Sequence, residues 1–298
     1  MLARMLQFTI LSVCAISLTW FFVFWERSPG LALGVFLGSL LLYVPFLGLQ
    51  FLFLHRINLN DPAQPASWGA LFRACWQEIL QVPRAFFWRQ AFFWNAIPDT
   101  DADSLDYRGQ LGVVFIHGFI CNRGLWTPWL DRLSKRRRAF IAVNLEPVFG
   151  SIDEYAPLID AAVSRVTQIT HRPPLIVCHS MGGLAVRAWL RSGSGTDARV
   201  HHIVTIGTPH QGTWLGRMAF TANGRQMRLD SRWLRQLQTD ESLARYSLFT
   251  CYYSNCDNIV FPASTATLQG ADNRFVPGAA HVAMAFDQTV MSESLARI

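Results

Sequence analysis

The distribution of hydrophobic and polar residues divides the chain into three parts. The first part holds two long runs without a charged residue, 5–25 and 30–54, separated by the polar turn 26–29. Each run is at least as long as the roughly 20 helical residues that cross a hydrocarbon core about 30 Å thick. The pattern therefore predicts a transmembrane helical hairpin over residues 1–56, with spans at about 5–25 and 30–54.

Two alternatives to a spanning hairpin stay open. A secretory signal peptide has a shorter apolar core and a small-residue cleavage site. Here the first run is longer, no small-x-small pattern follows Trp25, and a second apolar run comes at once. The other alternative is that these segments lie in the membrane interface without crossing it.

The charges that flank the apolar runs predict the orientation of the hairpin. Arg4 precedes the first run and Arg56 follows the second, whereas the turn pairs Arg27 with Glu26. Lys and Arg are enriched on the cytoplasmic side of membranes. We therefore expect a membrane location, the inner membrane if the protein is bacterial, with the rest of the chain in the cytoplasm.

The second part, residues 57–110, is predicted to be an interfacial or linker segment with helical character. Apolar residues recur at helical spacing over 68–80, which predicts an amphipathic helix with Arg73 and Glu78 on its other faces. Residues 84–94 combine aromatic and basic side chains, as is typical of the membrane–water interface. Packing on the following domain as a core helix is the alternative.

In the third part, 111–298, short apolar runs alternate with amphipathic stretches. The predicted strands are 111–116, 139–145, 175–178, 200–206, 248–253 and 274–276, and the predicted helices include 126–133, 151–169 and 181–191. This alternation is typical of βαβ units. We expect an α/β domain with a mostly parallel sheet flanked by helices, and a helical cap inserted at 211–245.

Composition and charge exclude several classes of function. Charged residues make up 15% of the chain, against roughly 25% in ordinary globular proteins, and the apolar runs account for most of this deficit. The net charge of +6 includes the basic run 135–138, but no nucleic-acid-binding motif accompanies it. The six cysteines show no metal-ligand or disulfide spacing. We therefore expect free thiols, no metal or cofactor, and no nucleic-acid partner.

A candidate nucleophile lies between the strand 175–178 and the following helix. The sequence there is Cys178-His179-Ser180-Met181-Gly182. A serine on a tight strand-to-helix turn has an exposed hydroxyl, and the helix N-terminus favours the negative charge that develops there. Cys178 takes the place of the first glycine in the G-x-S-x-G pattern, where a small residue can substitute.

An activated serine needs a base and an acid that orients the base. Asp257 follows the strand 248–253, and His281 follows the last predicted strand, which gives the chain order Ser, Asp, His. Both residues are thus expected at the carboxyl edge of the sheet. His210 is a rival base, but it precedes Asp257 and breaks this order.

Two backbone N–H groups are candidates for an oxyanion hole. Met181 follows the nucleophile, and Phe119 belongs to the loop His117-Gly118-Phe119 after the first strand. Gly118 allows the loop to turn so that the N–H of Phe119 faces the substrate oxygen. We expect His117 to brace this loop rather than to act as a base.

Taken together, these motifs resemble the lipase/esterase branch of the α/β-hydrolase superfamily. The resemblance rests on 117–119, 178–183, 257–260 and His281, and on the run Gly207-Thr208-Pro209-His210-Gln211-Gly212-Thr213, which is similar to that of bacterial triacylglycerol lipases. It implies that Ser180 is the nucleophile, Asp257 the acid and His281 the base, with Phe119 and Met181 as oxyanion donors. It does not cover the two apolar runs or the aromatic segment.

The expected function is a membrane-anchored serine hydrolase of lipid metabolism that cleaves carboxylic esters through an acyl-enzyme. Its expected partners are the bilayer and a lipid-like or other small acyl ester. The same triad also serves thioesterases, acyltransferases and amidases, and a non-catalytic membrane scaffold is a further alternative. The sequence leaves open whether 211–245 is a mobile lid or a plain cap, and it does not indicate acyl chain length or oligomeric state.

Overall fold

The computed structural model describes residues 1–101, 107–193 and 196–298. Its centre is a six-stranded sheet with the order β2-β1-β3-β4-β5-β6, and every neighbouring pair is parallel. The strands are β1 (Val113–Ile116), β2 (Phe140–Val143), β3 (Leu175–His179), β4 (His202–Ile206), β5 (Phe249–Tyr253) and β6 (Asp272–Phe275). Each lies close to its expected position, which confirms the predicted α/β fold.

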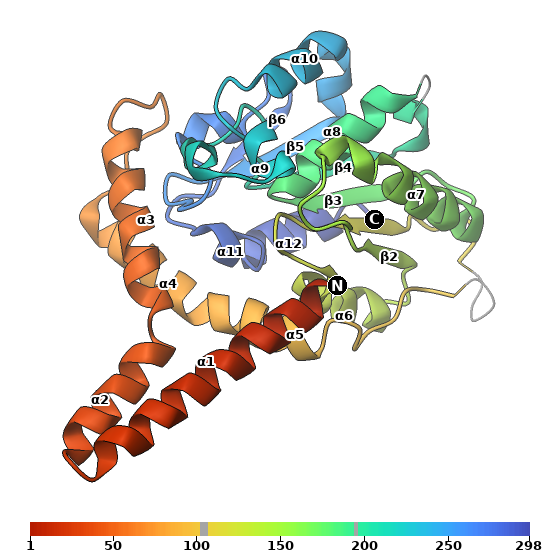
Figure 1. Cartoon of the computed structure of the whole chain (residues 1–298). Helices are drawn as coiled ribbons and strands as arrows, with labels where there is room; N and C mark the ends of the chain where they lie inside the picture. Colours follow the sequence, from red (N-terminus) through yellow and green to blue (C-terminus); the bar gives the residue numbers. More distant parts are fainter. Residues whose placement is uncertain (102–106, 194–195) are drawn as a thin grey trace.

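Helices cover both faces of the sheet (Figure 1). On one face α7 (Ala156–Thr170) and α8 (Met181–Ser192) pack against alternate strand residues such as Val114. On the other face α6 (Thr127–Lys135) and α12 (Gln288–Leu295) pack against the residues between them, such as Phe115. Because successive strand side chains point to opposite faces, one apolar strand supplies both cores.

The remaining helices lie before the sheet or in its connections. The first group is α1 (Leu2–Trp25), α2 (Pro29–Leu40), α3 (Tyr43–Asn58), α4 (Trp68–Val82), the π-helical η1 (Pro83–Arg89) and α5 (Gln90–Phe92). The second group is η2 (Arg123–Trp126), η3 (Ile152–Tyr155), η4 (Thr196–Arg199), η5 (Trp214–Met218), α9 (Ala222–Gln226), α10 (Arg232–Asp240), η6 (Leu243–Leu248), η7 (Ala263–Ala266) and α11 (His281–Met284). Residues 102–106 of the predicted linker segment lie outside the described residues.

Helices α1 and α2 pack side by side and project from the rest of the molecule (Figure 1). The Ser39 hydroxyl donates a hydrogen bond of 2.7 Å to that of Ser17 between them. Within the described residues α1 is the one unbroken helix that is long and apolar enough to cross a membrane. Its 24 residues give a length of about 36 Å. A signal sequence passes the same test.

The second apolar run is not one straight helix. It forms α2 and α3, which meet the length and hydropathy requirement together but bend by 51° at the break between them. Helix α3 packs on the α/β domain, where its buried polar side chains form hydrogen bonds. Gln50 Oε1 accepts a hydrogen bond of 2.7 Å from Asn258 Nδ2, and Asn58 Oδ1 accepts one of 3.2 Å from the N–H of Ala263.

Helix α4 packs on the domain through the face next to its aromatic stripe. Its buried residues are Leu71, Ala74 and Glu78, whereas Trp68, Phe72 and Trp76 of the predicted apolar stripe are more than half exposed. Glu78 lies off the aromatic stripe, as expected, but its face is the one that packs on the domain. Small side chains and one carboxylate pack against the domain, and the large aromatic side chains point outward.

The inserted segment 211–245 is fixed at its end by a buried ion pair. Arg187 of α8 forms a bond of 2.6 Å with Glu241, and both side chains are almost fully buried. The same guanidinium donates to the carbonyl oxygen of His210 at 2.9 Å. A second attachment joins the Trp233 indole N–H to Asp153 at 2.8 Å. The segment is therefore attached at both ends of α10.

We expect Arg187→Met to lower the free energy of unfolding by about 3–5 kcal/mol, because it leaves the Glu241 carboxylate buried without its partner. The control is Lys135→Met, which removes an exposed pair with Asp131 and is expected to cost about 0.5 kcal/mol or less. Urea unfolding in detergent, followed by tryptophan fluorescence, measures both. Equal losses in the two variants would contradict this account of the insert.

Candidate active site

Ser180 occupies a strained turn between β3 and α8. Its backbone has φ 54° and ψ −130°, a region that side-chain-bearing residues rarely adopt. Two contacts hold it there: its N–H donates to the carbonyl oxygen of Ile206 at 2.9 Å, and Thr208 Oγ1 donates to its own carbonyl oxygen at 2.8 Å. The strand-to-helix turn predicted from the sequence is therefore present.

Close backbone contacts explain the glycines that follow the serine. A methyl group at Gly182 would overlap the carbonyl oxygen of Ile116, and one at Gly183 would overlap the side chain of Thr208. Cys178, on the strand side, is fully buried between the sheet and α8. Burial raises the pKa of its thiol well above the ordinary value, so Cys178 is an inert packing residue.

Asp257 and His281 lie in direct contact and are both buried. His281 Nδ1 donates to the Asp257 carboxylate, with 2.9 Å to each oxygen. Asp257 Oδ1 also accepts the N–H groups of Ile259 and Val260 at 3.0 and 2.8 Å. Burial alone would lower the pKa of His281, but the charge and hydrogen bond of Asp257 outweigh it and raise that pKa.

The serine and the Asp257–His281 pair meet around Gly207, directly after β4. A methyl group at Gly207 would lie 2.8 Å from Asp257 Oδ2 and 3.1 Å from His281 Nδ1. The preceding carbonyl, that of Ile206, binds the N–H of Ser180. Among the described contacts no hydrogen bond joins Ser180 Oγ to His281. Such bonds are often long before substrate binds.

The loop after β1 lies against Ser180. A methyl group at Gly118 would lie 2.7 Å from Ser180 Cβ, so the following Phe119 is close to the serine. Met181 begins α8, where the first N–H groups lack a partner within the helix. His117 accepts the N–H of Leu145 at 3.0 Å and contacts the carbonyl oxygen of Gly118 at 2.9 Å. Burial lowers its pKa to about 4, so a neutral ring braces the loop.

The two other histidines near the motifs make different contacts. His210 is buried away from Asp257 and reaches Thr205 Oγ1 at 3.1 Å and Cys251 Sγ at 3.5 Å. His179 packs its ring on that of His281 with 4.6 Å between centroids, and its Nε2 donates to the carbonyl oxygen of His281 at 3.2 Å. The structure therefore places His281, not His210, beside Asp257.

Sequence reasoning missed two residues that hold the His281 segment. Asn258 Oδ1 accepts the N–H of His281 at 3.2 Å, and Glu78 accepts the next two backbone N–H groups. A signal for Glu78 was present, because Leu71, Ala74 and Glu78 are spaced i, i+3, i+7 and share one helix face. The larger aromatic stripe on the neighbouring face obscured it.

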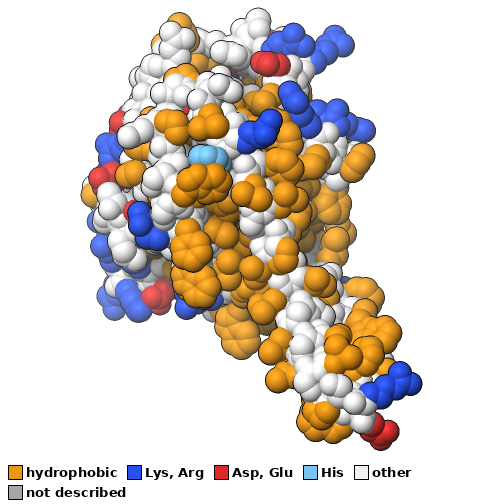
Figure 2. Space-filling model, turned by 90° about the vertical axis from the view of Figure 1, so that its left-hand side faces the viewer, with side chains coloured by type: hydrophobic (Ala, Val, Ile, Leu, Met, Phe, Trp, Pro, Cys, Tyr) orange, Lys and Arg blue, Asp and Glu red, His pale blue; other side chains and the backbone are white. Residues whose placement is uncertain are grey.

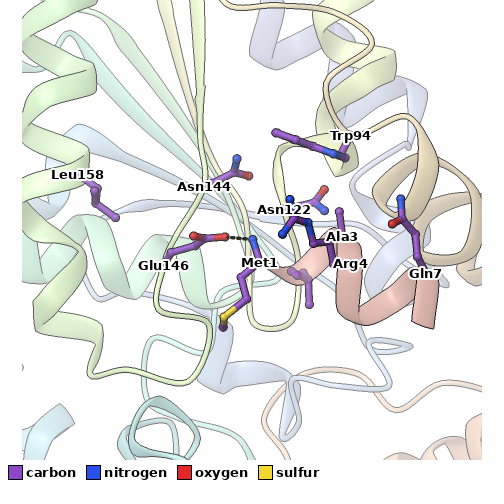
Figure 3. Close-up of a pocket in the computed structure, with 10 residues that line it drawn as sticks. Met1, Ala3, Arg4, Gln7, Trp94, Asn122, Asn144, Glu146 and Leu158 are labelled. Carbon is purple, nitrogen blue, oxygen red and sulfur yellow. Dashed lines mark hydrogen bonds and ion pairs between the residues drawn. The ribbon is translucent and has the colours of Figure 1, made fainter. Parts of the chain in front are cut away.

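A cavity of about 740 Å³ lies at the start of α1 (Figure 3). Its lining combines the start of α1 with Trp94, Asn122 and Asn144, and the Met1 ammonium pairs with Glu146 across it at 2.7 Å. Ser180, Asp257 and His281 do not line it. In the described ranges no group of three His, Cys, Asp or Glu side chains is placed to hold a metal ion.

A parallel sheet that presents a serine on a strand-to-helix turn defines the α/β-hydrolase class of fold. The chain belongs to the alpha/beta hydrolase family: the family model matches residues 113–295, more than half of the chain. A search of curated proteins gave no significant match.

Solved structures of lipases and esterases share the fold. Aspergillus fumigatus lipase B matches with a TM-score of 0.55 and 18% identity, over 63% of this chain and 53% of that chain. Bacillus licheniformis lipase BlEst2, mature form, gives 0.53 and 16%, over 63% and 90%. The metagenomic carboxyl esterase MGS0156 gives 0.50 and 14%, over 63% and 75%. The match spans about half of the length of the Aspergillus protein. At these identities the likeness shows a common fold.

We expect Gly118→Ala to slow the reaction of Ser180 with a fluorophosphonate at least tenfold, because the added methyl group displaces the loop or the serine. The control is Gly69→Ala on α4, where the nearest atom to the new methyl group is 3.8 Å away, at the end of the Arg73 side chain. Labelling rates and melting temperatures are measured together. Unchanged labelling of a correctly folded Gly118→Ala protein would show that the loop does not approach the serine.

Proposed function

We propose that the protein is a membrane-anchored serine hydrolase that cleaves carboxylic esters. The observation that carries this proposal is the buried pair of Asp257 and His281, joined at 2.9 Å, next to the strained Ser180 turn. A structural role alone does not explain why a serine is held with φ 54° at that place. Backbone strain of this kind clusters at functional sites.

The proposed reaction begins with attack of Ser180 Oγ on the ester carbonyl carbon. His281 takes the serine proton at Nε2, while Asp257 holds Nδ1–H and stabilises the imidazolium. The N–H groups of Phe119 and Met181 bind the oxyanion of the tetrahedral intermediate. His281 then returns the proton to the leaving alcohol, which leaves an acyl group on Ser180. Water, deprotonated by His281, hydrolyses this acyl-enzyme and restores the serine.

The apolar surface supports a lipid-like substrate at a membrane. Figure 2 shows hydrophobic side chains covering the face formed by α3 and α4 and continuing along the projecting helices, with charged side chains at their tip. The exposed members are large and include Leu42, Phe46, Leu49, Leu52, Trp68, Phe72, Trp76 and Trp88. Monomeric soluble proteins rarely expose contiguous apolar areas of this kind. The aromatic side chains suit the interfacial layer.

The lengths of the helices fit a hairpin that enters the bilayer while the domain rests on its surface. Helix α1 is about 36 Å long, but its first two turns lie against the domain, and α2, with 12 residues, is about 18 Å long and too short to cross alone. The apolar first turns of α3 would continue from α2 and bring the chain back to the membrane surface. Helix α1 is tied to its neighbours by Ser17 and by Gln7, which donates to the carbonyl oxygen of Ala91 at 2.7 Å. These contacts favour an anchor over a cleaved signal.

The cap and α3 meet close to the site. Trp214 of η5 packs on Phe53 of α3 with 5.1 Å between ring centroids, and on Phe261 with 6.0 Å. This contact joins the cap to the helix that follows the projecting hairpin. The attachments of Arg187 and Trp233 favour a plain cap over a lid that moves as one piece. Thioesters and amides would form the same acyl-enzyme and remain alternatives within the proposal.

We expect purified full-length protein in detergent or nanodiscs to be labelled by a fluorophosphonate at Ser180. Ser180→Ala should abolish labelling and lower ester hydrolysis at least 10⁴-fold. Ser134→Ala, a surface serine of α6, is the matched control. A panel of p-nitrophenyl esters, thioesters and anilides of several chain lengths identifies the preferred bond.

Absence of labelling in the folded wild-type protein, together with no hydrolysis of any acyl substrate, would contradict the enzyme proposal. That result would favour a non-catalytic membrane scaffold. Faster turnover of thioesters than of esters at equal chain length would keep the triad but correct the substrate class.

A further inference from the structure

Glu78 places a second carboxylate close to His281, the proposed proton acceptor of the triad. It belongs to α4, outside residues 113–295 that match the family model. Its side chain is 1% exposed. Charged residues are almost never fully buried unless they are paired, so the contacts of Glu78 need a specific explanation.

The carboxylate binds the backbone directly after His281. Glu78 Oε1 accepts the N–H of Val282 at 2.9 Å, and Oε2 accepts the N–H of Ala283 at 3.1 Å. Both donors lie in the first turn of α11, where N–H groups have no acceptor within the helix. Each carboxylate oxygen therefore has its own donor, and both donors move with the histidine.

Other buried side chains hold the remaining polar groups of His281. Asn258 Oδ1 accepts its N–H at 3.2 Å, His179 Nε2 donates to its carbonyl oxygen at 3.2 Å, and Asp257 accepts from Nδ1 at 2.9 Å. Glu78 completes this set and ties it to α4. The ring is thereby fixed with Nε2 as its free nitrogen.

The charge of Glu78 also acts on the imidazole. The titratable groups that face His281 are Asp257 from the β5–β6 connection, Glu78 from α4 and the His179 ring from β3, with the Cys75 thiol one turn away on α4. Burial lowers the pKa of His179 well below its ordinary value, so that ring is neutral. The negative charges of Asp257 and Glu78 both raise the pKa of His281.

We propose that Glu78 is a positioning residue of the active site, which fixes the backbone after His281 and supports the imidazolium through its negative charge. This inference rests on the proposed serine-hydrolase function. It also means that the segment before the α/β domain is part of the catalytic apparatus rather than an anchor alone. The base can then keep its place only while α4 is packed on the domain.

The ionisation of Glu78 is coupled to that of His281. Burial, helped by the charge of Asp257, raises the pKa of Glu78 to about 7 although the two backbone hydrogen bonds and the charge of His281 lower it. His281 must be neutral to accept the serine proton, so kcat/KM falls as the pH drops through the pKa of the coupled pair. The fall in kcat/KM at low pH is the acidic limb of the pH–rate profile. Without the charge of Glu78, the pKa of His281 is lower, and this acidic limb moves to lower pH.

The test compares Glu78→Gln and Glu78→Asp in the full-length protein. The glutamine amide nitrogen cannot accept a hydrogen bond, so one N–H of α11 loses its partner and the charge is removed. We expect kcat to fall at least tenfold with KM little changed, and the acidic limb to move to lower pH. Glu78→Asp keeps the charge but withdraws the carboxylate, so kcat falls while the limb stays in place.

Two controls separate this role from general stability and from surface charge. Gln77→Ala changes the exposed neighbour on the same helix, and Asp131→Asn removes a carboxylate from the surface of α6. Both are expected to keep the wild-type rate and pH profile. Melting temperatures, and the fraction of protein labelled at Ser180 on long incubation with a fluorophosphonate, report how much of each variant is folded.

A wild-type protein that is labelled at Ser180, with Glu78→Gln unchanged in kcat and acidic limb, would overturn the positioning role and leave the proposed function intact. The positioning role would also be overturned if kcat fell only in proportion to the folded fraction and the acidic limb of the pH–rate profile lay at the same pH in Glu78→Gln and Glu78→Asp. If the folded wild-type protein is not labelled at all, the proposed function fails first, and the role of Glu78 fails with it.

Discussion

The backbone conformation of Ser180 is the constraint on which the rest of the structure depends. A non-glycine residue at φ 54° costs on the order of 1–3 kcal/mol, and it persists only where the surroundings fix it. Here the end of β1, the Ser180 turn and the Asp257–His281 pair lie so close to Gly118, Gly182 and Gly207 that these glycines have no room for a side chain. The same close packing brings the β1 loop and the Asp257–His281 pair to the serine. The strain and the assembly of the site thus have one cause.

A second theme is that buried polar groups, rather than apolar contacts alone, join the N-terminal helices to the domain. Gln50 and Asn58 bind the segment around Asn258, and Glu78 binds the segment after His281. A buried donor or acceptor without a partner costs about 1–3 kcal/mol. These contacts therefore specify one arrangement of α3 and α4 on the domain, and they leave the large aromatic side chains of α4 outside. The exposed aromatic face and the fixed position of the His281 segment are two consequences of the same packing.

The sequence predicted the parts of the structure that local patterns determine. Six strands, the turn at Ser180 and the order of Asp257 and His281 follow from short apolar runs and the residues that end them. It did not predict the bend between α2 and α3, although Pro45 is a sign of it: proline has no N–H to donate to the carbonyl oxygen of Leu41, directly after the end of α2. It also did not predict that the face of α4 with Glu78 packs on the domain. When a helix is apolar on two faces, periodicity cannot tell which face contacts protein and which contacts solvent or lipid. For α4 the packed face is identified only in the folded protein, by the hydrogen bonds that Glu78 accepts from the backbone of α11.

The most direct test of the central claim is the detection of an acyl group on Ser180 during turnover. Full-length protein is mixed with a short-chain p-nitrophenyl ester, quenched in acid within the first turnovers, digested and analysed by tandem mass spectrometry. The account predicts the acyl mass on the peptide that contains Ser180, and its absence in His281→Ala. Ester hydrolysis without this adduct, or with the acyl group on another residue, would contradict it.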